Sequence, residues 1–178
     1  MISLSSLETI KASIRNVPDF PVKGIQFKDI TTVIKQPELL KAIIDQIVSQ
    51  YQHKGITKIV AIESTGFITG GALAYRLGAG IVPVRKPLKL PAETYSKTYD
   101  LEYGQDSLEI HRDALQPDDV VLLHDDLLAT GGTAMAALDL ISLFGIRQVY
   151  VNFIIELGFL NGRQKISPPY DLTSLIHL

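Results

Sequence analysis

One stretch of the chain decides the predicted fold: residues 120–133 read VVLLHDDLLATGGT. Its first four residues are apolar, which predicts a strand buried on both faces, as in the interior of a parallel sheet. Two acids, Asp125 and Asp126, follow at the carboxyl end of that strand, where open α/β sheets bind their ligands. A short loop, 129–133, then leads into a helical pattern at 134–144. This order of strand, acids, loop and helix predicts a ligand site at the strand end.

The loop 129–133 has the composition of a phosphate cradle. Gly131 and Gly132 carry no side chain, so a ligand can approach their backbone closely. Thr130 and Thr133 add hydroxyl donors, and the free N–H groups at the start of a helix attract an anion. We therefore expect this loop to bind a phosphate group.

Adjacent carboxylates would repel a simple phosphate ester. The ligand must therefore suit both the acid pair and the phosphate-binding loop. A sugar phosphate does so, because Asp125 and Asp126 can accept hydrogen bonds from vicinal ribose hydroxyls while the loop holds the 5′-phosphate. A magnesium ion carried by the ligand would screen the remaining charge. An acid pair or a glycine pair alone more often just ends a strand or forms a turn. The complete order favours the sugar-phosphate site.

Length and composition narrow the class of protein. The 178 residues fit one domain, 1–178, with a sizeable core, and 46% hydrophobic and 20% charged residues are ordinary for a globular protein. A net charge of −2 argues against a nucleic acid partner. The absence of cysteine excludes disulfides and thiolate chemistry. The first residues lack the pattern of a signal peptide and no apolar run would cross a bilayer, so we expect a cytoplasmic protein without a membrane partner.

Strand and helix patterns alternate through the chain. We expect a first helix that stops before Pro18, and strand-like flanks around a polar, tyrosine-rich hairpin or lid at 91–105. The alternation predicts an α/β fold with a central, mostly parallel sheet flanked by helices. The other expected helices cover 38–51 and 68–77, and the other expected strands cover 58–62, 81–84, 94–99, 107–110, 148–155 and 171–178.

The run HDDLLATGGTA resembles the phosphoribosyl-diphosphate (PRPP) motif of the type I phosphoribosyltransferases, and VVLLHDDLLATGGTA is similar to the adenine phosphoribosyltransferases among them. The likeness extends from about residue 18 to 163 and implies the type I fold, with an N-terminal hood at about 18–32 and a flexible hairpin lid at about 91–107. His124 stands where most relatives carry an aliphatic residue, and we interpret it as a strand-end residue that faces away from the ribose. By resemblance, Asp125 and Asp126 bind the ribose, and the 5′-phosphate of AMP is bound by Ala129, Thr130, Gly131, Gly132 and Thr133.

The hood carries the run FPxxGIxFxDI, which resembles the base-binding segment of the adenine phosphoribosyltransferases. The resemblance implies that Phe27 packs on the purine face and that backbone groups near Ile25 and Lys28 read the edge of adenine. A peptide C=O and N–H can match the N6 donor and N1 acceptor of that base.

Two segments resemble the diphosphate-binding parts of the family. The residues Ser64, Thr65 and Gly66 follow the strand 58–62, and Thr65 stands where the family has an arginine, so we expect weaker PRPP binding or a substitute cation. A basic run then supplies Arg85, Lys86 and Lys89. By resemblance this run contacts the diphosphate, and Arg85 can reach across a homodimer interface.

The lid contains the run YDLEYG, which resembles the catalytic loop of the family. The resemblance makes Glu102 the proton-transfer residue and Tyr103 a neighbour that helps to close the site. Lids that exclude water from a site on closing often carry such functional residues.

The resemblance thus implies a pentosyltransferase of purine salvage that converts adenine and PRPP to AMP and diphosphate with Mg²⁺, in a homodimer. Three alternatives stay open. A phosphoribosyltransferase for another base (guanine, hypoxanthine or orotate) would need a different hood. A non-enzymatic PRPP-sensing regulator would need a DNA-binding segment, for which the chain has no spare basic domain. A non-catalytic nucleotide-binding module would bind AMP and release no diphosphate from PRPP.

Overall fold

The computed structural model describes residues 4–20, 23–100, 104–166 and 168–178. The chain forms two compact units, residues 1–50 and residues 51–178. The second unit contains the acid pair (Asp125 and Asp126) and the 129–133 loop.

A five-stranded sheet forms the centre of the second unit. Its order is β4-β3-β7-β8-β9, and all neighbouring strands are parallel, which confirms the predicted α/β fold. In a parallel sheet the carboxyl ends of all strands lie at one edge, so the segments that follow them meet there. The strands are β3 (Lys58–Ile62), β4 (Gly80–Val84), β7 (Val120–Leu128), β8 (Gln148–Glu156) and β9 (Asp171–His177).

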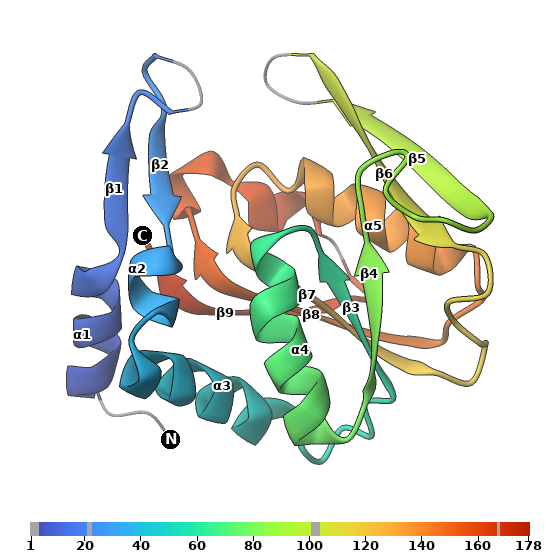
Figure 1. Ribbon diagram of the computed structural model, residues 1–178, viewed down its shortest axis with the longest axis horizontal. Helices are drawn as coiled ribbons and strands as arrows, with labels where there is room; N and C mark the ends of the chain where they lie inside the picture. Colours follow the sequence, from blue (N-terminus) through green and yellow to red (C-terminus); the bar gives the residue numbers. More distant parts are fainter. Residues whose placement is uncertain (1–3, 21–22, 101–103, 167) are drawn as a thin grey trace. The chain divides into compact units, whose positions relative to one another are not determined.

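The helix α4 (Thr65–Leu77) crosses the sheet and contacts β3, β7 and β4 (Figure 1). Gly70 permits this close packing, because a Cβ there would lie 2.9 Å from the Cβ of Ala61. Side chains alternate along a strand, so Val60 and Ile62, on either side of Ala61, point to the opposite face of the sheet. There they belong to a core cluster that includes residues of α5 (Gly132–Ser142). The sheet is therefore buried on both faces, as the apolar run predicted.

A hairpin of β5 (Thr94–Asp100) and β6 (Gln105–His111) packs against α5 and projects beyond it in Figure 1. A bridge between Arg85 and Glu109 joins this hairpin to the segment that follows β4. Two short 3-10 helices, η1 (Gly158–Leu160) and η2 (Gly162–Lys165), follow β8. The predicted hairpin is confirmed.

The first unit holds α1 (Leu4–Ser13), an antiparallel ribbon of β1 (Arg15–Pro18) and β2 (Gln26–Asp29), and the helices α2 (Thr31–Ile34) and α3 (Pro37–Tyr51). The last residue of α3 belongs to the second unit. The strand β1 was not anticipated; it pairs with β2, and Arg15 and Asp29 form an ion pair across the ribbon.

Among the element boundaries that differ from the sequence prediction, three lie next to the acid pair, the 64–66 turn and the 129–133 loop. The strand β7 continues to Leu128, so Asp125 and Asp126 lie within it and not after it, because the pairing with β8 continues past them. The helix α4 begins at Thr65 and α5 begins at Gly132, both earlier than expected. These shifts place the last part of the 129–133 loop in the first turn of α5.

Candidate active site

A small cavity of about 80 Å³ lies at the carboxyl end of β7. Backbone and side chains of the strand end, the 129–133 loop and the first turn of α5 surround it, and Phe153 of β8 closes one side. The structure thus brings one carboxylate of the acid pair and most of the loop to a common space. The lining residues are Asp125, Leu127, Leu128, Ala129, Thr130, Gly131, Thr133, Ala134 and Phe153.

The shape of the 129–133 loop depends on two glycines that approach each other from distant parts of the chain. Gly131 has φ +80°, a left-handed conformation that favours glycine, and a Cβ there would lie 2.6 Å from the carbonyl oxygen of Gly162. A Cβ on Gly162 would in turn lie 2.1 Å from the carbonyl oxygen of Ala129. The loop is therefore shaped by backbone-to-backbone packing against η2.

The acid pair is electrostatically unusual. Burial raises the pKa of Asp125 well above its usual range, and the neighbouring charge of Asp126 raises it further. The Asp125 Oδ1 atom accepts a hydrogen bond of 2.9 Å from the backbone N–H of Asp126. Ligand hydroxyls that donate to these oxygens would stabilise the charged form.

The start of α4 lies directly beside the acid pair. A Cβ on Gly66 would be 2.8 Å from Asp125 Oδ1, so only glycine fits there without a shift. Ser64 precedes the helix, Thr65 begins it, and a cis peptide joins Glu63 to Ser64. The first N–H groups of an α-helix have no partner within the helix, so this turn can bind an anion next to Asp125.

The basic run after β4 makes contacts within the second unit. Arg85 donates from Nε to Glu63 Oε2 at 2.9 Å and from Nη1 to the carbonyl oxygen of Lys89 at 3.2 Å. Its guanidinium also lies 5.8 Å from the centre of the Phe67 ring. The contact with Glu63 places Arg85 next to the 64–66 turn, whereas the side chain of Lys89 is exposed.

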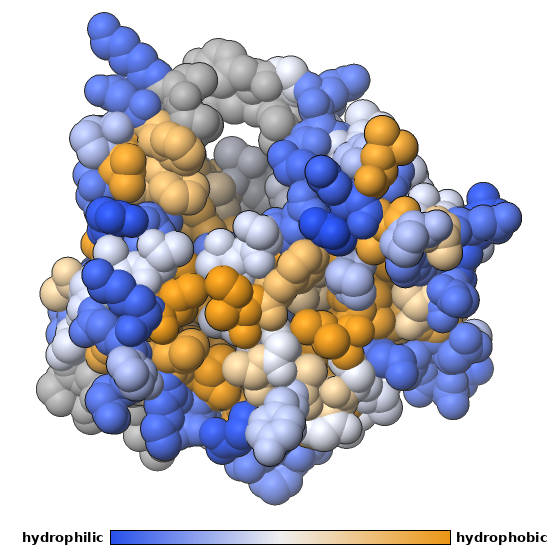
Figure 2. All heavy atoms as spheres, in the orientation of Figure 1, coloured by the Kyte–Doolittle hydropathy of each residue, from blue (hydrophilic) through white to orange (hydrophobic). Residues whose placement is uncertain are grey.

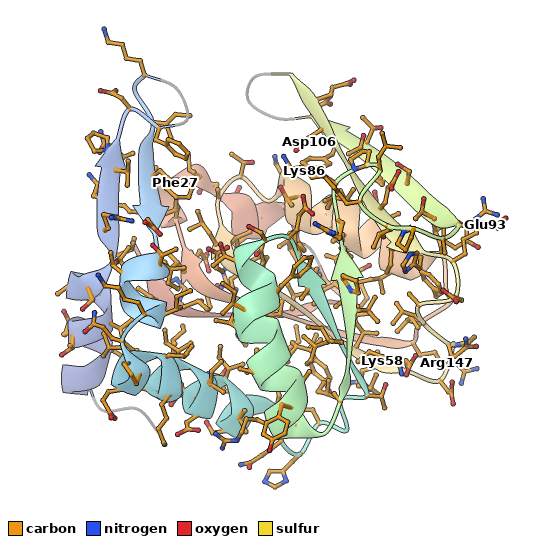
Figure 3. All side chains as sticks on the ribbon, in the orientation of Figure 1. Phe27, Lys58, Lys86, Glu93, Asp106 and Arg147 are labelled. Carbon is orange, nitrogen blue, oxygen red and sulfur yellow. The ribbon has the colours of Figure 1, made fainter. Side chains whose placement is uncertain are left out.

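Lys86 connects the basic run to the hairpin. Its Nζ forms an ion pair of 3.0 Å with Asp106 of β6, and both residues are labelled in Figure 3. Hydrogen bonding to Asp106 raises the pKa of Lys86, so it remains a cation. On the same hairpin, the Tyr99 hydroxyl accepts a hydrogen bond of 3.3 Å from Thr133. The hairpin therefore contacts both the basic run and the 129–133 loop.

The remaining predicted site residues belong to the first unit or fall outside the described residues. Phe27 and Lys28 are on β2 of the first unit and Ile25 precedes it, and the Phe27 ring packs edge-on against Phe20 with centroids 5.3 Å apart. Figure 3 labels Phe27. Glu102 and Tyr103 lie outside the described residues.

Sequence reasoning missed three residues at the site. Gly162, Tyr99 and Asp106 contact the loop or the basic run, yet each lies far from its partner in the sequence. The run LNGR held a weak signal for the first of them, because an Asn-Gly pair marks a turn.

No group of three or more His, Cys, Asp or Glu residues within 4–20, 23–100, 104–166 and 168–178 is arranged to hold a metal ion. Over the same ranges, none of the helices has the length and apolar character needed to span a membrane.

Comparison with known proteins gives matches over nearly the whole chain. The family described as the phosphoribosyl transferase domain matches residues 30–170. The adenine phosphoribosyltransferase of Phocaeicola vulgatus is 57% identical over 168 residues, which are 94% of this chain and 95% of the relative.

Solved structures agree with this result. The crystal structure of adenine phosphoribosyltransferase from Rhodothermus marinus has a TM-score of 0.94 at 49% identity and covers 99% of this chain and 100% of its own. The enzyme of Giardia lamblia complexed with 9-deazaadenine has a TM-score of 0.93 at 41% identity, with 97% of each chain covered.

Proposed function

The chain belongs to the adenine phosphoribosyltransferases of the phosphoribosyl transferase family, and from this premise we propose that it converts adenine and PRPP to AMP and diphosphate in purine salvage. One observation carries the proposal beyond the comparisons: most of the tightly packed 129–133 loop lines one cavity together with Asp125 of the acid pair. That combination suits a ribose 5-phosphate. We further propose that residues 1–178 work as one transferase domain in the cytoplasm.

The substrate contacts follow from the carboxyl edge of the sheet. The 129–133 loop would bind the 5′-phosphate through backbone N–H groups and the threonine hydroxyls. Asp125 and Asp126 would accept hydrogen bonds from the ribose diol. The 64–66 turn would bind the diphosphate, together with the basic run of Arg85, Lys86 and Lys89. Ile25, Phe27 and Lys28 of the hood would bind adenine.

The hard step is cleavage of the bond between ribose C1 and the diphosphate oxygen, which builds positive charge on the sugar. The carboxylates at 125 and 126 would stabilise that charge, and the cations and helix N–H groups would stabilise the departing diphosphate. As N9 of adenine bonds to C1, the base loses a proton, which we assign to the Glu102 carboxylate. Tyr103 would help the lid to exclude water.

Magnesium is the cofactor we propose. The ion would be held mainly through PRPP and water, and the Thr130 hydroxyl and the Asp126 carboxylate would offer it oxygen, the ligand type that magnesium prefers. When bound on PRPP, the ion supplies positive charge that screens the diphosphate. The chain's own part is to hold the ribose and the base in line, which lowers the barrier by orientation.

A spectroscopic assay with PRPP and magnesium tests the function. We expect turnover with adenine at least about 100-fold faster than with guanine or hypoxanthine, because a site built to pair with one set of base donors leaves polar groups unpaired with another.

Glu102→Gln should lower kcat by about 100-fold or more while AMP still binds, because general acid–base catalysis contributes about that much.

The assay also separates the alternatives. Preference for another base would contradict the adenine assignment, and AMP binding without release of diphosphate from PRPP would identify a non-catalytic binding protein. Unchanged kcat in Glu102→Gln would remove the proton-transfer role.

We propose that the enzyme is a homodimer that uses α4 and β4. Ile68 and Tyr75 lie seven residues apart on one face of α4 and are 55% and 87% exposed, and Ile81 on the edge strand β4 is 45% exposed. A Cβ on Gly71, between them, would lie 4.0 Å from Ile81 Cδ1, so the helix and strand residues form one apolar surface. Figure 2 shows hydrophobic side chains at the surface over these elements. Contiguous exposed apolar patches mark association sites.

Sedimentation equilibrium tests this interface. The wild-type protein should have twice the chain mass of 19.6 kDa, and the double substitution Ile68→Glu with Tyr75→Glu should give the single-chain mass. Leu143→Glu is the matched control. Leu143 is 57% exposed, but it lies at the C-terminal end of α5 and belongs to neither α4 nor β4. A monomeric wild type, or a dimeric double variant, would refute the assignment.

A further inference from the structure

A row of hydrogen-bonded polar side chains, most of them buried, crosses the sheet of the second unit from α4 to β9. Thr69 of α4 bonds His124 of β7 (Oγ1 to Nε2, 2.8 Å), and His124 Nδ1 bonds Asn152 Oδ1 of β8 at 3.0 Å. Asn152 Nδ2 donates to Thr173 Oγ1 of β9 at 2.9 Å, and Thr173 bonds the Tyr51 hydroxyl at 2.7 Å. The side chains of Thr69 and His124 are fully buried.

The partners fix the hydrogens of this row. Asn152 uses its amide nitrogen to donate to Thr173, so its oxygen is the atom that accepts from His124. His124 must then carry its proton on Nδ1, and Nε2 accepts from the hydroxyl of Thr69. Burial lowers the pKa of His124 to about 4, so the ring is neutral at physiological pH. With the Asn152 amide in this orientation, only the Nδ1–H tautomer of His124 satisfies both ring nitrogens.

The row lies close to both proposed substrate-binding segments. Thr69 and Gly66 are three residues apart on α4 and so share one face, and Gly66 is the residue that approaches Asp125. His124 directly precedes Asp125 on β7. The bond from Thr69 to His124 therefore fixes the helix that begins with the diphosphate turn to the strand that carries the ribose acids.

We propose that His124 is a positioning residue for the transferase reaction: through its bond to Thr69 it sets the spacing between the 64–66 turn and Asp125, and so preorganises the PRPP site. This inference rests on the proposed function, since it assigns those two segments to one substrate. The other end of the row, the bond from Asn152 to Thr173, joins β8 to β9 and contacts neither α4 nor Asp125, so its loss leaves the bond from Thr69 to His124 in place.

Two matched substitutions separate positioning from general stability. Thr69→Val and Thr173→Val each replace a hydroxyl in the row by a methyl group. Thr69→Val should raise the Kd of PRPP, measured by calorimetry, and its KM by about threefold to tenfold, since one hydrogen bond of this kind is lost. The KM for adenine should stay within about twofold. Thr173→Val should lower the Tm and leave the Kd of PRPP within about twofold of wild type. Thr69→Ser keeps the hydroxyl and should therefore keep the wild-type Kd of PRPP.

Equal losses of PRPP affinity in both valine variants, no loss in Thr69→Val, or failure of Thr69→Ser to recover would overturn the positioning role. A second readout does not need turnover: ¹⁵N NMR of histidine-labelled protein, with His124→Leu for assignment, should show the Nδ1–H tautomer for His124. An Nε2–H tautomer would refute the arrangement. Absence of AMP synthesis by wild type that still binds PRPP would refute the proposed function alone.

Discussion

Gly162→Ala should lower the affinity for AMP, and kcat/KM for PRPP, by about 100-fold or more, since a displacement of about 1 Å in a binding group can cost that much. A Cβ at this position would lie 2.1 Å from the Ala129 carbonyl oxygen and 2.9 Å from the Gly131 backbone nitrogen. Both are backbone atoms, so no side-chain rotation relieves the clash, and the packing between the 129–133 loop and η2 must change. Calorimetric titration with AMP measures the effect.

Gly158→Ala is the matched control for this prediction. Gly158 is also in a 3-10 helix after β8, and a Cβ there would meet only the Leu178 carbonyl oxygen at an ordinary 3.6 Å. We expect AMP affinity within about twofold of wild type for this variant. Wild-type affinity in Gly162→Ala would show that the loop does not need its packing against η2 to bind the nucleotide.

Asp125→Asn should stabilise the free protein at neutral pH while it lowers kcat by about 100-fold, because it removes a carboxylate that would stabilise the developing ribose cation. The pKa of Asp125 is raised in the fold by burial and by Asp126. A raised pKa contributes stability that is fully present below the unfolded value, 3.8, and is lost as the pH rises through the folded value. Asparagine has no such loss and keeps the Oδ1 acceptor for the Asp126 N–H.

Thermal unfolding at several pH values checks this prediction. The Tm gain of Asp125→Asn should grow between acidic and neutral pH, and about 1 kcal/mol would raise the Tm by about 2–4 °C. Asp118→Asn provides the control, because Asp118 is exposed and lies before β7. A lower Tm at pH 7 with unchanged kcat would show that Asp125 is a structural residue.

Much of the central sheet could be predicted from the sequence. The apolar run 120–123 gave the buried strand, and the alternating strands and helices gave a parallel sheet, because both patterns depend on local residue order. The extension of β7 through Asp125 could not be seen, since it follows from pairing with β8 and acidic residues disfavour strands.

Contacts within the candidate site were less accessible to sequence reasoning. The fit of Gly131 against Gly162 and the bond from Thr133 to Tyr99 join residues about thirty positions apart. No local pattern encodes such distances. The position of His124 away from the cavity lining agrees with strand alternation, but its bonds to α4 and β8 became visible only in the structure.

A crystal structure with AMP bound tests the central claim most directly. We predict the 5′-phosphate on the backbone N–H groups of residues 129–133 and the ribose diol on the Asp125 and Asp126 carboxylates. AMP bound elsewhere, with this loop and the acid pair making no contact to it, would contradict the account.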